Sequence, residues 1–304
     1  MERHEITLGD VTIGGPLGSR TGLLVGSIFY DNHSIVADAF SGEFDRDRAG
    51  ALIQRADKAA AAHGVQMAFD VIAASPEAVA AFLPFVAERS NAPMMINASE
   101  AEVRIAGLET AAELGVLDRC IFASLNMDTE DDELDALRKH RPGAVMIMAN
   151  DGADPSPEGC CTFIEEFYRP MLDDVGVTAP IVDLGTMDAP SVGVCMRGIA
   201  AVRERFGYPA GCAFSNCISQ WTGLRELGRE YVNYSLGAAL VACRAAGGDF
   251  LHYGLIEKAR AIAHIGGSAE VFFGFAAQEL DEHRLPKDHA LLRMFKLATE
   301  YPAS

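Results

Sequence analysis

The sequence predicts a (β/α)8 barrel, in which eight parallel strands alternate with helices. Eight short apolar runs recur along the chain, and continuous runs of this length are typical of strands buried on both faces. The segments between them have helical features, and polar residues follow most of the runs. The runs are "GLLVGSIF" from Gly22, "VQMAFD" from Val65, "PMMIN" from Pro93, "RCIFASLN" from Arg119, "GAVMIMAN" from Gly143, "PIVDLG" from Pro180, "GCAFSN" from Gly211 and "DFLHYG" from Asp249. An open doubly wound sheet is the second interpretation of this alternation.

Two of the segments between the runs have clear helix starts. In "SPEAVAAFLPFVAER", Ser75 is the expected N-cap and Pro76 takes the first helical position. The helix in "SEAEVRIAGLETAAEL" is expected to begin after Ser99. The apolar spacing predicts that its buried face consists of Ala101, Ile105, Leu108 and Ala112.

The N-terminal segment predicts a β-hairpin. "EITLGDVTIGG" from Glu5 alternates apolar and polar residues on both sides of Gly9 and Asp10. We expect this hairpin to plug the bottom of the barrel. Because no linker or low-complexity tract interrupts the chain, we expect one domain, with the hairpin in residues 1–21 and the barrel in residues 22–304.

The composition excludes several functional classes. With a formal net charge of −18, the chain has little to neutralise phosphates with, so nucleic-acid binding is not expected. No apolar run approaches the roughly 20 residues that span a bilayer, and the N-terminus does not resemble a signal peptide. We therefore expect a cytoplasmic protein without a membrane span. The seven cysteines are scattered without a C-x-x-C pair, so we expect reduced thiols and no bound metal.

Polar side chains gather where the predicted strands end, which is where a (β/α)8 barrel places its site. They are Ser27, Asp70, Asn97, Ser99, Ser124, Asn126, Asn150, Asp183, Ser215, Asn216, Gln220 and His252. The set is rich in amides and lacks a pair of a nucleophile and a base. It suits a flat heterocycle whose edge alternates donors and acceptors, because amides offer both and a carboxylate accepts two N–H bonds. The alternative for each residue is a cap of the following helix.

Other motifs are absent or incomplete. "GGPLGSRTG" from Gly14 lacks the order of residues in a phosphate loop. "DNHSIV" from Asp31 begins like a corrinoid-binding motif, but Val36 stands where that motif has glycine, so His33 is expected to be a loop histidine. His252 is expected to be a hydrogen-bonded inner-barrel histidine. Few basic residues follow the strand ends.

Several blocks of the sequence, from about Thr7 to about Ile262, resemble a known family. The blocks are "LLVGSIFYDNHSIV", "GEFDRDRAGALI", "FDVIAASPEAVAAFLPFVAE", "EVRIAGLETAAELGVLDR" and "IVDLGTMDAPSVG". In this order they are similar to the H subunit of tetrahydromethanopterin S-methyltransferase and its bacterial relatives. The relatives include enzymes of glycine betaine catabolism that pass a methyl group from a methylcorrinoid protein to tetrahydrofolate.

The resemblance implies a pterin-binding methyltransferase barrel with tetrahydrofolate as substrate. Within "SNCISQ", Asn216 corresponds to the contact with the reactive N5 of the pterin, and Asp183 to the contact with its amino-pyrimidinone edge. The remaining pterin contacts are expected from Asp70, Asn97, Asn126, Ser215 and Gln220. Methylcobalamin is expected on a separate corrinoid protein or free, and relatives of this kind are commonly homodimers.

Two strand ends depart from the pattern of pterin-binding methyltransferases. The third strand ends in Asn97 and Ala98 where those proteins carry Asp-Ser. The fourth carries Ala123 and Ser124 where they carry Asn-Ser, and Asn126 is the candidate substitute.

Three other functions remain open. A transfer of methyl from a methylamine or betaine to the corrinoid favours an aromatic cage, for which the candidates are Phe29, Tyr30, Phe214, Trp221 and Tyr253. Condensation at a pterin side chain needs a phosphate site at the barrel top, where few basic residues are expected. A non-catalytic docking subunit of a corrinoid methyltransferase system is the third.

Overall fold

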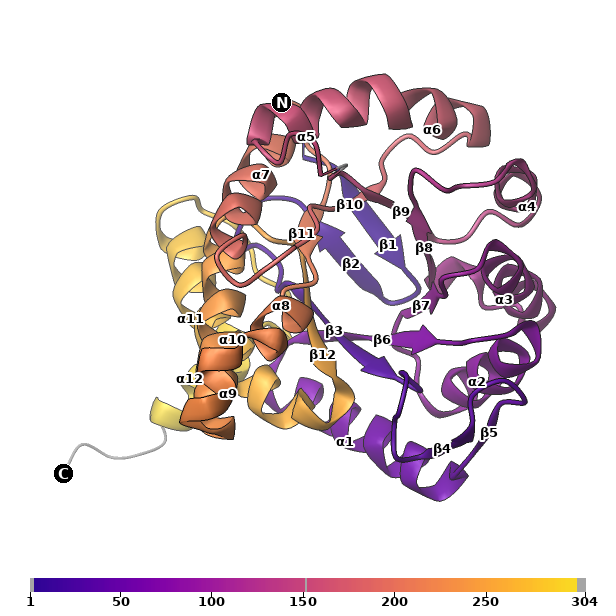
Figure 1. Ribbon diagram of the computed structural model, residues 1–304. Helices are drawn as coiled ribbons and strands as arrows, with labels where there is room; N and C mark the ends of the chain where they lie inside the picture. The colour runs from indigo at the N-terminus through magenta and orange to yellow at the C-terminus, as the bar shows by residue number, and fades with distance from the viewer. Residues whose placement is uncertain (1–2, 151, 300–304) are drawn as a thin grey trace.

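Eight parallel strands close into a barrel in the computed structural model, which describes residues 3–150 and 152–299 (Figure 1). The strands are β3 (Leu23–Ile28), β6 (Gln66–Ile72), β7 (Met94–Asn97), β8 (Cys120–Leu125), β9 (Ala144–Met148), β10 (Ile181–Asp183), β11 (Ala210–Cys212) and β12 (Phe250–Leu255). Neighbours follow in chain order, and the ring closes where β12 pairs with β3. The predicted (β/α)8 barrel is confirmed, and the open sheet is wrong because a closed ring has no edge strand.

Helices surround the barrel and connect successive strands (Figure 1). They are α1 (Arg46–His63), α2 (Pro76–Arg89), α3 (Ala101–Leu114), α4 (Asp131–His140), α5 (Pro157–Phe163), α6 (Arg169–Val175), α7 (Val192–Arg205), α8 (Ser215–Gln220), α9 (Thr222–Leu227), α10 (Arg229–Ala245), α11 (Ala259–Glu279) and α12 (Ala290–Thr299). Shorter segments are β4 (Val36–Asp38), β5 (Glu43–Phe44), η1 (Leu117–Arg119), η2 (Ile164–Tyr168) and η3 (Ile256–Lys258). Residues 1, 2, 151 and 300–304 of the expected hairpin and barrel segments lie outside the described residues.

The predicted start of α2 is confirmed. The Ser75 hydroxyl accepts a hydrogen bond from the backbone N–H of Ala78 at 3.0 Å, and Pro76 is the first helical residue. This cap satisfies one of the N–H groups that the first turn leaves without a helical partner.

Helix α3 begins one residue later than predicted, and its predicted buried face is correct in part: Leu108 is buried and Ile105 packs against the core, whereas Ala101 and Ala112 are only partly buried. Glu100, not Ser99, precedes the helix. The buried residues are Val103, Arg104, Gly107, Leu108 and Ala111. Arg104 is buried because its Nε donates to Glu133 at 2.6 Å, while its Nη1 donates to the carbonyl oxygens of Ala98 and Ser99. An arginine that fixes the loop after β7 therefore occupies a face that the apolar spacing did not assign to it.

The N-terminal hairpin lies inside one end of the ring, as predicted. Strands β1 (Glu5–Leu8) and β2 (Val11–Gly14) pair antiparallel, and Figure 1 shows them within the circle of barrel strands. Leu8 and Ile13 are fully buried in a cluster that includes Leu23 and Phe250, the first residues of β3 and β12. The hairpin therefore closes the end of the barrel where the strands begin, the bottom. A second, larger core lies between the barrel and the helices.

Buried ion pairs hold the bottom together. Arg203 pairs with Asp249, the residue before β12, and donates to the Gly15 carbonyl oxygen at 2.6 Å. Arg244 pairs with Glu270 at 2.5 Å, and each of these four side chains is at most 5% exposed. Pairing is required at such depth because an isolated charge carries a large desolvation cost.

Within the described ranges, no helix is both long and apolar enough to cross a membrane. The seven cysteines are free and buried. Burial raises the pKa of the Cys120 thiol to about 12, and a buried thiol of this kind is chemically inert.

Candidate functional site

The upper ends of five strands each turn one polar side chain into the barrel. Successive side chains of a strand point to opposite faces, so a residue two places beyond an inward apolar residue also points inward. Val25, Ala68, Met95, Ile181 and Phe250 belong to the interior cluster. Two places beyond them stand Ser27, Asp70, Asn97, Asp183 and His252. The interior is therefore apolar at its lower levels and polar at the mouth, and we name these five residues the polar layer.

Asp70 is the centre of the hydrogen bonds in this layer. Its Oδ2 accepts from the Ser27 hydroxyl at 2.8 Å and lies 2.9 Å from His252 Nε2. Its Oδ1 accepts from Asn97 Nδ2 at 2.9 Å. Asp70 is 1% exposed, so both of its oxygens are occupied by protein groups and the carboxylate is fixed in place.

The polar layer places two carboxylates beside one imidazole. Burial alone lowers the pKa of His252, but the hydrogen bond and charge of Asp70 and the charge of Asp183 raise it above its ordinary value. For Asp70, burial raises the pKa, and the hydrogen bonds from His252, Asn97 and Ser27 lower it below its ordinary value. Each residue therefore favours the charged form of the other.

Asp183 differs from Asp70 because no side chain donates a hydrogen bond to it among the described residues. Its Oδ1 accepts from the Gly185 N–H at 2.8 Å, and no side chain occupies its Oδ2 within the described ranges. Burial raises the pKa of Asp183 above its ordinary value, against the opposing effects of the Gly185 N–H, the His252 charge and the Ala213 N–H. A ligand that donates hydrogen bonds would compensate this burial.

Helix α8 brings the predicted residues Ser215, Asn216 and Gln220 to the same end of the barrel. A side-chain carbon on Gly254 would lie 2.9 Å from Ser215, and Gly254 has a φ of +81°, so only glycine lets α8 approach β12 this closely. Ser215 is buried, and its hydroxyl has no hydrogen-bond partner among the described residues. Asn216 and Gln220 are exposed and four positions apart, which places them on one face of α8.

Two predicted amides are partly committed to the protein itself. Asn97 uses its Nδ2 on Asp70. The Asn126 side chain uses its Oδ1 to accept from the Asp128 N–H at 2.7 Å, and the backbone N–H of Asn126 donates to Thr129 Oγ1 at 2.8 Å. Asn126 therefore shapes the loop after β8, and its Nδ2 is the group that remains for a ligand.

The aromatic residues do not form a cage. Phe29, Phe214 and Tyr253 are at most 4% exposed and belong to the core between the barrel and the helices. Phe29 stacks on Phe82 with their ring centroids 4.1 Å apart. Three of the five candidates therefore point away from the mouth, which removes the main feature expected for recognition of a quaternary amine.

His33 is a buried loop histidine, as predicted. Its Nδ1 accepts from the Phe29 N–H at 3.1 Å, and its Nε2 lies 3.0 Å from Glu257 in η3. Glu257 also accepts from the Tyr30 hydroxyl at 3.1 Å. The loop after β3 is thereby fixed to the segment after β12.

The expectation of few basic residues near the top was wrong. A groove of about 570 Å³ beside α8 and the end of β12 is lined by Arg225, Arg229 and Lys258. Arg225 and Arg229 lie five and nine positions beyond Gln220, and Lys258 lies five beyond Tyr253, so none of them belongs to a strand end. We name this space the basic groove.

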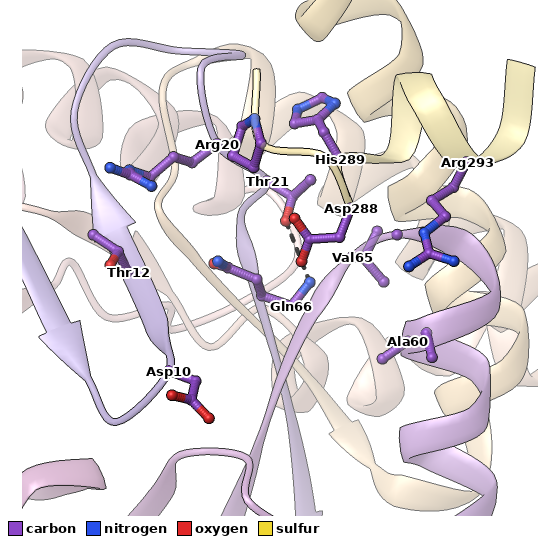
Figure 2. A pocket seen from close by; sticks show the side chains of 13 residues that line it. Asp10, Thr12, Arg20, Thr21, Ala60, Val65, Gln66, Asp288, His289 and Arg293 are labelled. Carbon is purple, nitrogen blue, oxygen red and sulfur yellow. Dashed lines mark hydrogen bonds between the residues drawn. The ribbon is translucent and has the colours of Figure 1, made fainter. Parts of the chain in front are cut away.

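A second cavity, of about 280 Å³, lies at the bottom and is not part of the polar layer. Figure 2 shows Thr21, Gln66 and Asp288 around it. Gln66 begins β6, and its N–H donates to Thr21 Oγ1 at 3.3 Å. The cavity is therefore at the opposite end from Asp70 and Asp183.

The hydrogen-bonding groups at the mouth suit a neutral, planar ligand that carries donors and acceptors on its edge. In the described ranges, no group of three or more His, Cys, Asp or Glu side chains could hold a metal ion. His252 and Ser27 are the residues whose role sequence reasoning undervalued. The signal was present, since His252 lies two residues beyond inward-facing Phe250.

The chain matches the family description "Tetrahydromethanopterin S-methyltransferase MtrH subunit" over residues 2–282. It is 32% identical to the H subunit of tetrahydromethanopterin S-methyltransferase from Methanothermobacter marburgensis, over 96% of this chain and 98% of the relative. It is 29% identical to the H subunit of a putative mtx methyltransferase from Methanosarcina barkeri, over 92% of this chain and 94% of the relative.

Among solved structures, the barrel is similar to dihydropteroate synthases. The enzyme of Xanthomonas albilineans with 4-aminobenzoic acid has a TM-score of 0.61 and 16% identity, over 91% of this chain and 99% of that chain. The Thermus thermophilus enzyme in complex with 4-aminobenzoate has a TM-score of 0.60 and 16% identity, over 89% of this chain and 100% of that chain. At this identity the likeness supports the fold alone.

Proposed function

The chain belongs to the family of the tetrahydromethanopterin S-methyltransferase MtrH subunit, and from this premise we propose that it moves a methyl group between a methylcorrinoid and N5 of tetrahydrofolate. The observation that carries the proposal is the composition of the mouth. It combines Asp183, which keeps one oxygen for a ligand, with the exposed amide of Asn216 and the buried hydroxyl of Ser215. Such groups suit the edge of a reduced pterin and provide no nucleophile.

Asp183 is assigned to the amino-pyrimidinone edge of the ring. Its Oδ2 accepts an N–H of that edge, a charge-assisted bond stronger than one between neutral groups. The Gly185 N–H holds Oδ1 and therefore sets the direction of Oδ2. Ser215 and the Nδ2 of Asn126 supply further donors, and Gln220 closes the outer side of the ring.

Asp70 and Asn97 act as positioning residues. Their mutual hydrogen bond, together with Ser27 and His252, fixes the floor on which the ring lies. The Asn97 amide oxygen accepts a hydrogen bond from the ligand. A rigid floor lowers the cost of aligning N5 with the incoming methyl group.

Asn216 is assigned to N5. In the direction from methylcorrinoid to pterin, the N5 lone pair forms the N–CH3 bond. The Co–C bond breaks with both electrons remaining on cobalt, and the N5 proton leaves to solvent. The Asn216 amide accepts the N5–H as positive charge develops on that nitrogen, so its stabilisation is greatest in the transition state.

The corrinoid is assigned to a partner protein that covers the mouth. Exposed apolar side chains lie at or beyond the ends of six barrel strands: Phe40, Met127, Met148, Met187, Trp221 and Leu255. Exposed apolar side chains on the segments after these strands suit a partner that excludes water during transfer. Exposed Phe272, Phe275 and Phe295 on α11 and α12 form a separate apolar face, which we assign to a second copy of the chain in a homodimer.

Calorimetric titration under anaerobic conditions tests the function directly. The ligands are tetrahydrofolate, 5-methyltetrahydrofolate and tetrahydromethanopterin. Binding of the folates with a negative heat-capacity change supports the assigned acceptor, and methylcobalamin turnover is then measured. If tetrahydromethanopterin binds more tightly than either folate, tetrahydromethanopterin is the acceptor instead of tetrahydrofolate. Binding of none at millimolar concentration would leave a non-catalytic docking subunit as the better explanation.

A further inference from the structure

The basic groove concentrates positive charge in a strongly acidic protein. The chain carries a net charge of −18, yet three cations line this one space: Arg225 on α9, Arg229 at the start of α10 and Lys258 in η3. Within the described residues, none of the three has a carboxylate within ion-pair distance. Although the chain is rich in acidic residues, these three cations have no acidic partner at ion-pair distance in the described part of the chain and are available for an external anion.

The carboxylate in the groove is already committed. Glu257 lines the groove, but its oxygens accept from the Tyr30 hydroxyl and lie 3.0 Å from His33. The hydrogen bond from His33 leads the effects that lower the Glu257 pKa. Burial lowers the pKa of Lys258, the Glu257 charge opposes this, and the Arg229 charge lowers the pKa further; the negative charge of a bound anion would raise it.

The groove lies next to the proposed pterin site, along α8 and the end of β12. Ser219 lies on its wall and is three positions after Asn216, on the same side of α8. Leu255, which also lines the groove, ends the strand that carries His252. Figure 1 shows α8, α9 and α10 stacked beside the end of β12. A chain that leaves the pterin ring past Asn216 along α8 would therefore run toward the groove.

We infer that the basic groove binds the carboxylates of the anionic tail attached to the reduced pterin, with an oligoglutamate as the matching chemistry. The inference rests on the proposed function and adds a determinant of substrate preference to it. The groove volume of about 570 Å³ is within the usual range of small-molecule sites, which leaves room for more than one carboxylate. Arg225 and Arg229 suit carboxylates because a guanidinium binds both oxygens at once.

The test compares three ligands that share the ring and differ in the tail. They are 6-methyltetrahydropterin, tetrahydrofolate with one glutamate, and tetrahydrofolate with three. The triple variant Arg225→Gln, Arg229→Gln, Lys258→Gln is measured against a matched triple variant at exposed cations elsewhere: Arg55→Gln, Lys58→Gln, Arg197→Gln. Dissociation constants are measured by calorimetry at two salt concentrations.

We expect the wild-type protein to bind the triglutamate about tenfold more tightly than the ring alone, since each partly exposed ion pair contributes a few-fold. The preference should shrink at high salt and vanish in the groove variant, while the matched variant keeps it. Affinity for 6-methyltetrahydropterin should be the same in all three proteins.

The possible failures are distinguishable. Equal binding of all three ligands by the wild-type protein, or an unchanged preference in the groove variant, overturns the tail assignment and leaves the pterin site intact. If inorganic pyrophosphate binds the groove while added glutamates bring no gain, the groove serves a phosphate instead, and the inference is wrong. If the wild-type protein binds none of the three pterins, the proposed function is wrong as well.

Discussion

The two ends of the barrel treat buried charge in opposite ways. At the bottom, Arg203 and Arg244 each have one acidic partner, and further bonds go to backbone carbonyl oxygens such as that of Gly15. At the mouth, two carboxylates, Asp70 and Asp183, share the single imidazole of His252. The bottom is balanced in charge and the mouth has an acidic excess.

This difference shows which end is built to be completed by a ligand. A balanced pair is costly to break, so it fixes the chain ends that close the ring. An unmatched carboxylate such as Asp183, and the unpaired hydroxyl of Ser215, carry a desolvation cost that only an added partner removes. Changes at the bottom should therefore act mainly on stability, whereas changes at the mouth should act mainly on binding or rate.

The largest effect is expected from Arg244→Met at the bottom. The change leaves Glu270 buried without its cation, so unfolding should become easier by about 3–5 kcal/mol. Urea denaturation followed by circular dichroism measures this, with exposed Arg55→Met as the control. A loss below about 1 kcal/mol, the range of exposed pairs, would remove the contrast between the ends.

Asn216→Ala should slow methyl transfer by about 10²- to 10³-fold, the usual loss when one transition-state contact is removed. Pterin affinity should fall only a few-fold, and stability should change little because Asn216 is exposed. Single-turnover kinetics with methylcobalamin separates the two effects. Asn91→Ala, in an exposed loop before β7, is the control. Equal losses in rate and affinity would reduce Asn216 to a binding residue.

Asp183→Ala should weaken pterin binding by about 10- to 150-fold, as expected when a hydrogen bond to a charged group is lost. At micromolar protein this abolishes the calorimetric signal. Asp10→Ala, at the exposed turn of the hairpin, should leave binding unchanged. Unaltered affinity in Asp183→Ala would take Asp183 out of the site.

The smallest effect concerns the pH dependence of stability. The raised pKa of His252 means that its contribution is complete below about pH 6.5 and is lost as pH rises through the folded-state pKa. The lowered pKa of Asp70 means that its contribution is lost as pH falls through the folded-state value, below about 3.8. His252→Gln should remove the alkaline loss, at most about 1.4 kcal/mol per pH unit. The prediction is wrong if the free energy of unfolding, measured with urea, changes equally with pH from 6 to 9 in the wild-type and His252→Gln proteins.

The parts of the fold that depend on local pattern could be predicted. Buried runs and turn residues indicated every barrel strand and the hairpin, and the strand ends indicated Asp70, Asn97 and Asp183. Alternation along a strand also carried unused information, because Tyr253 follows inward-facing His252 and must therefore point outward.

The parts that depend on distant contacts could not be predicted. Arg104 is buried because Glu133, on another helix, neutralises it. Arg225 and Lys258 line one groove because α9 and η3 follow the neighbouring strands β11 and β12, although the two residues are far apart in sequence. The sequence pattern of neither segment indicates that these two residues line one groove.

The closure between β12 and β3 has a consequence for synthesis of the chain at the ribosome. Ser27 and His252 are 225 residues apart in sequence, so Asp70 and Ser27 leave the exit tunnel long before their imidazole partner exists. Until β12 emerges, the hairpin and the early strands lack Phe250, and the loop that must close spans 225 residues of the 304. The complete polar layer is therefore among the last features to form. A pterin that requires it would bind finished molecules and pass over truncated ones, stabilising only full-length product.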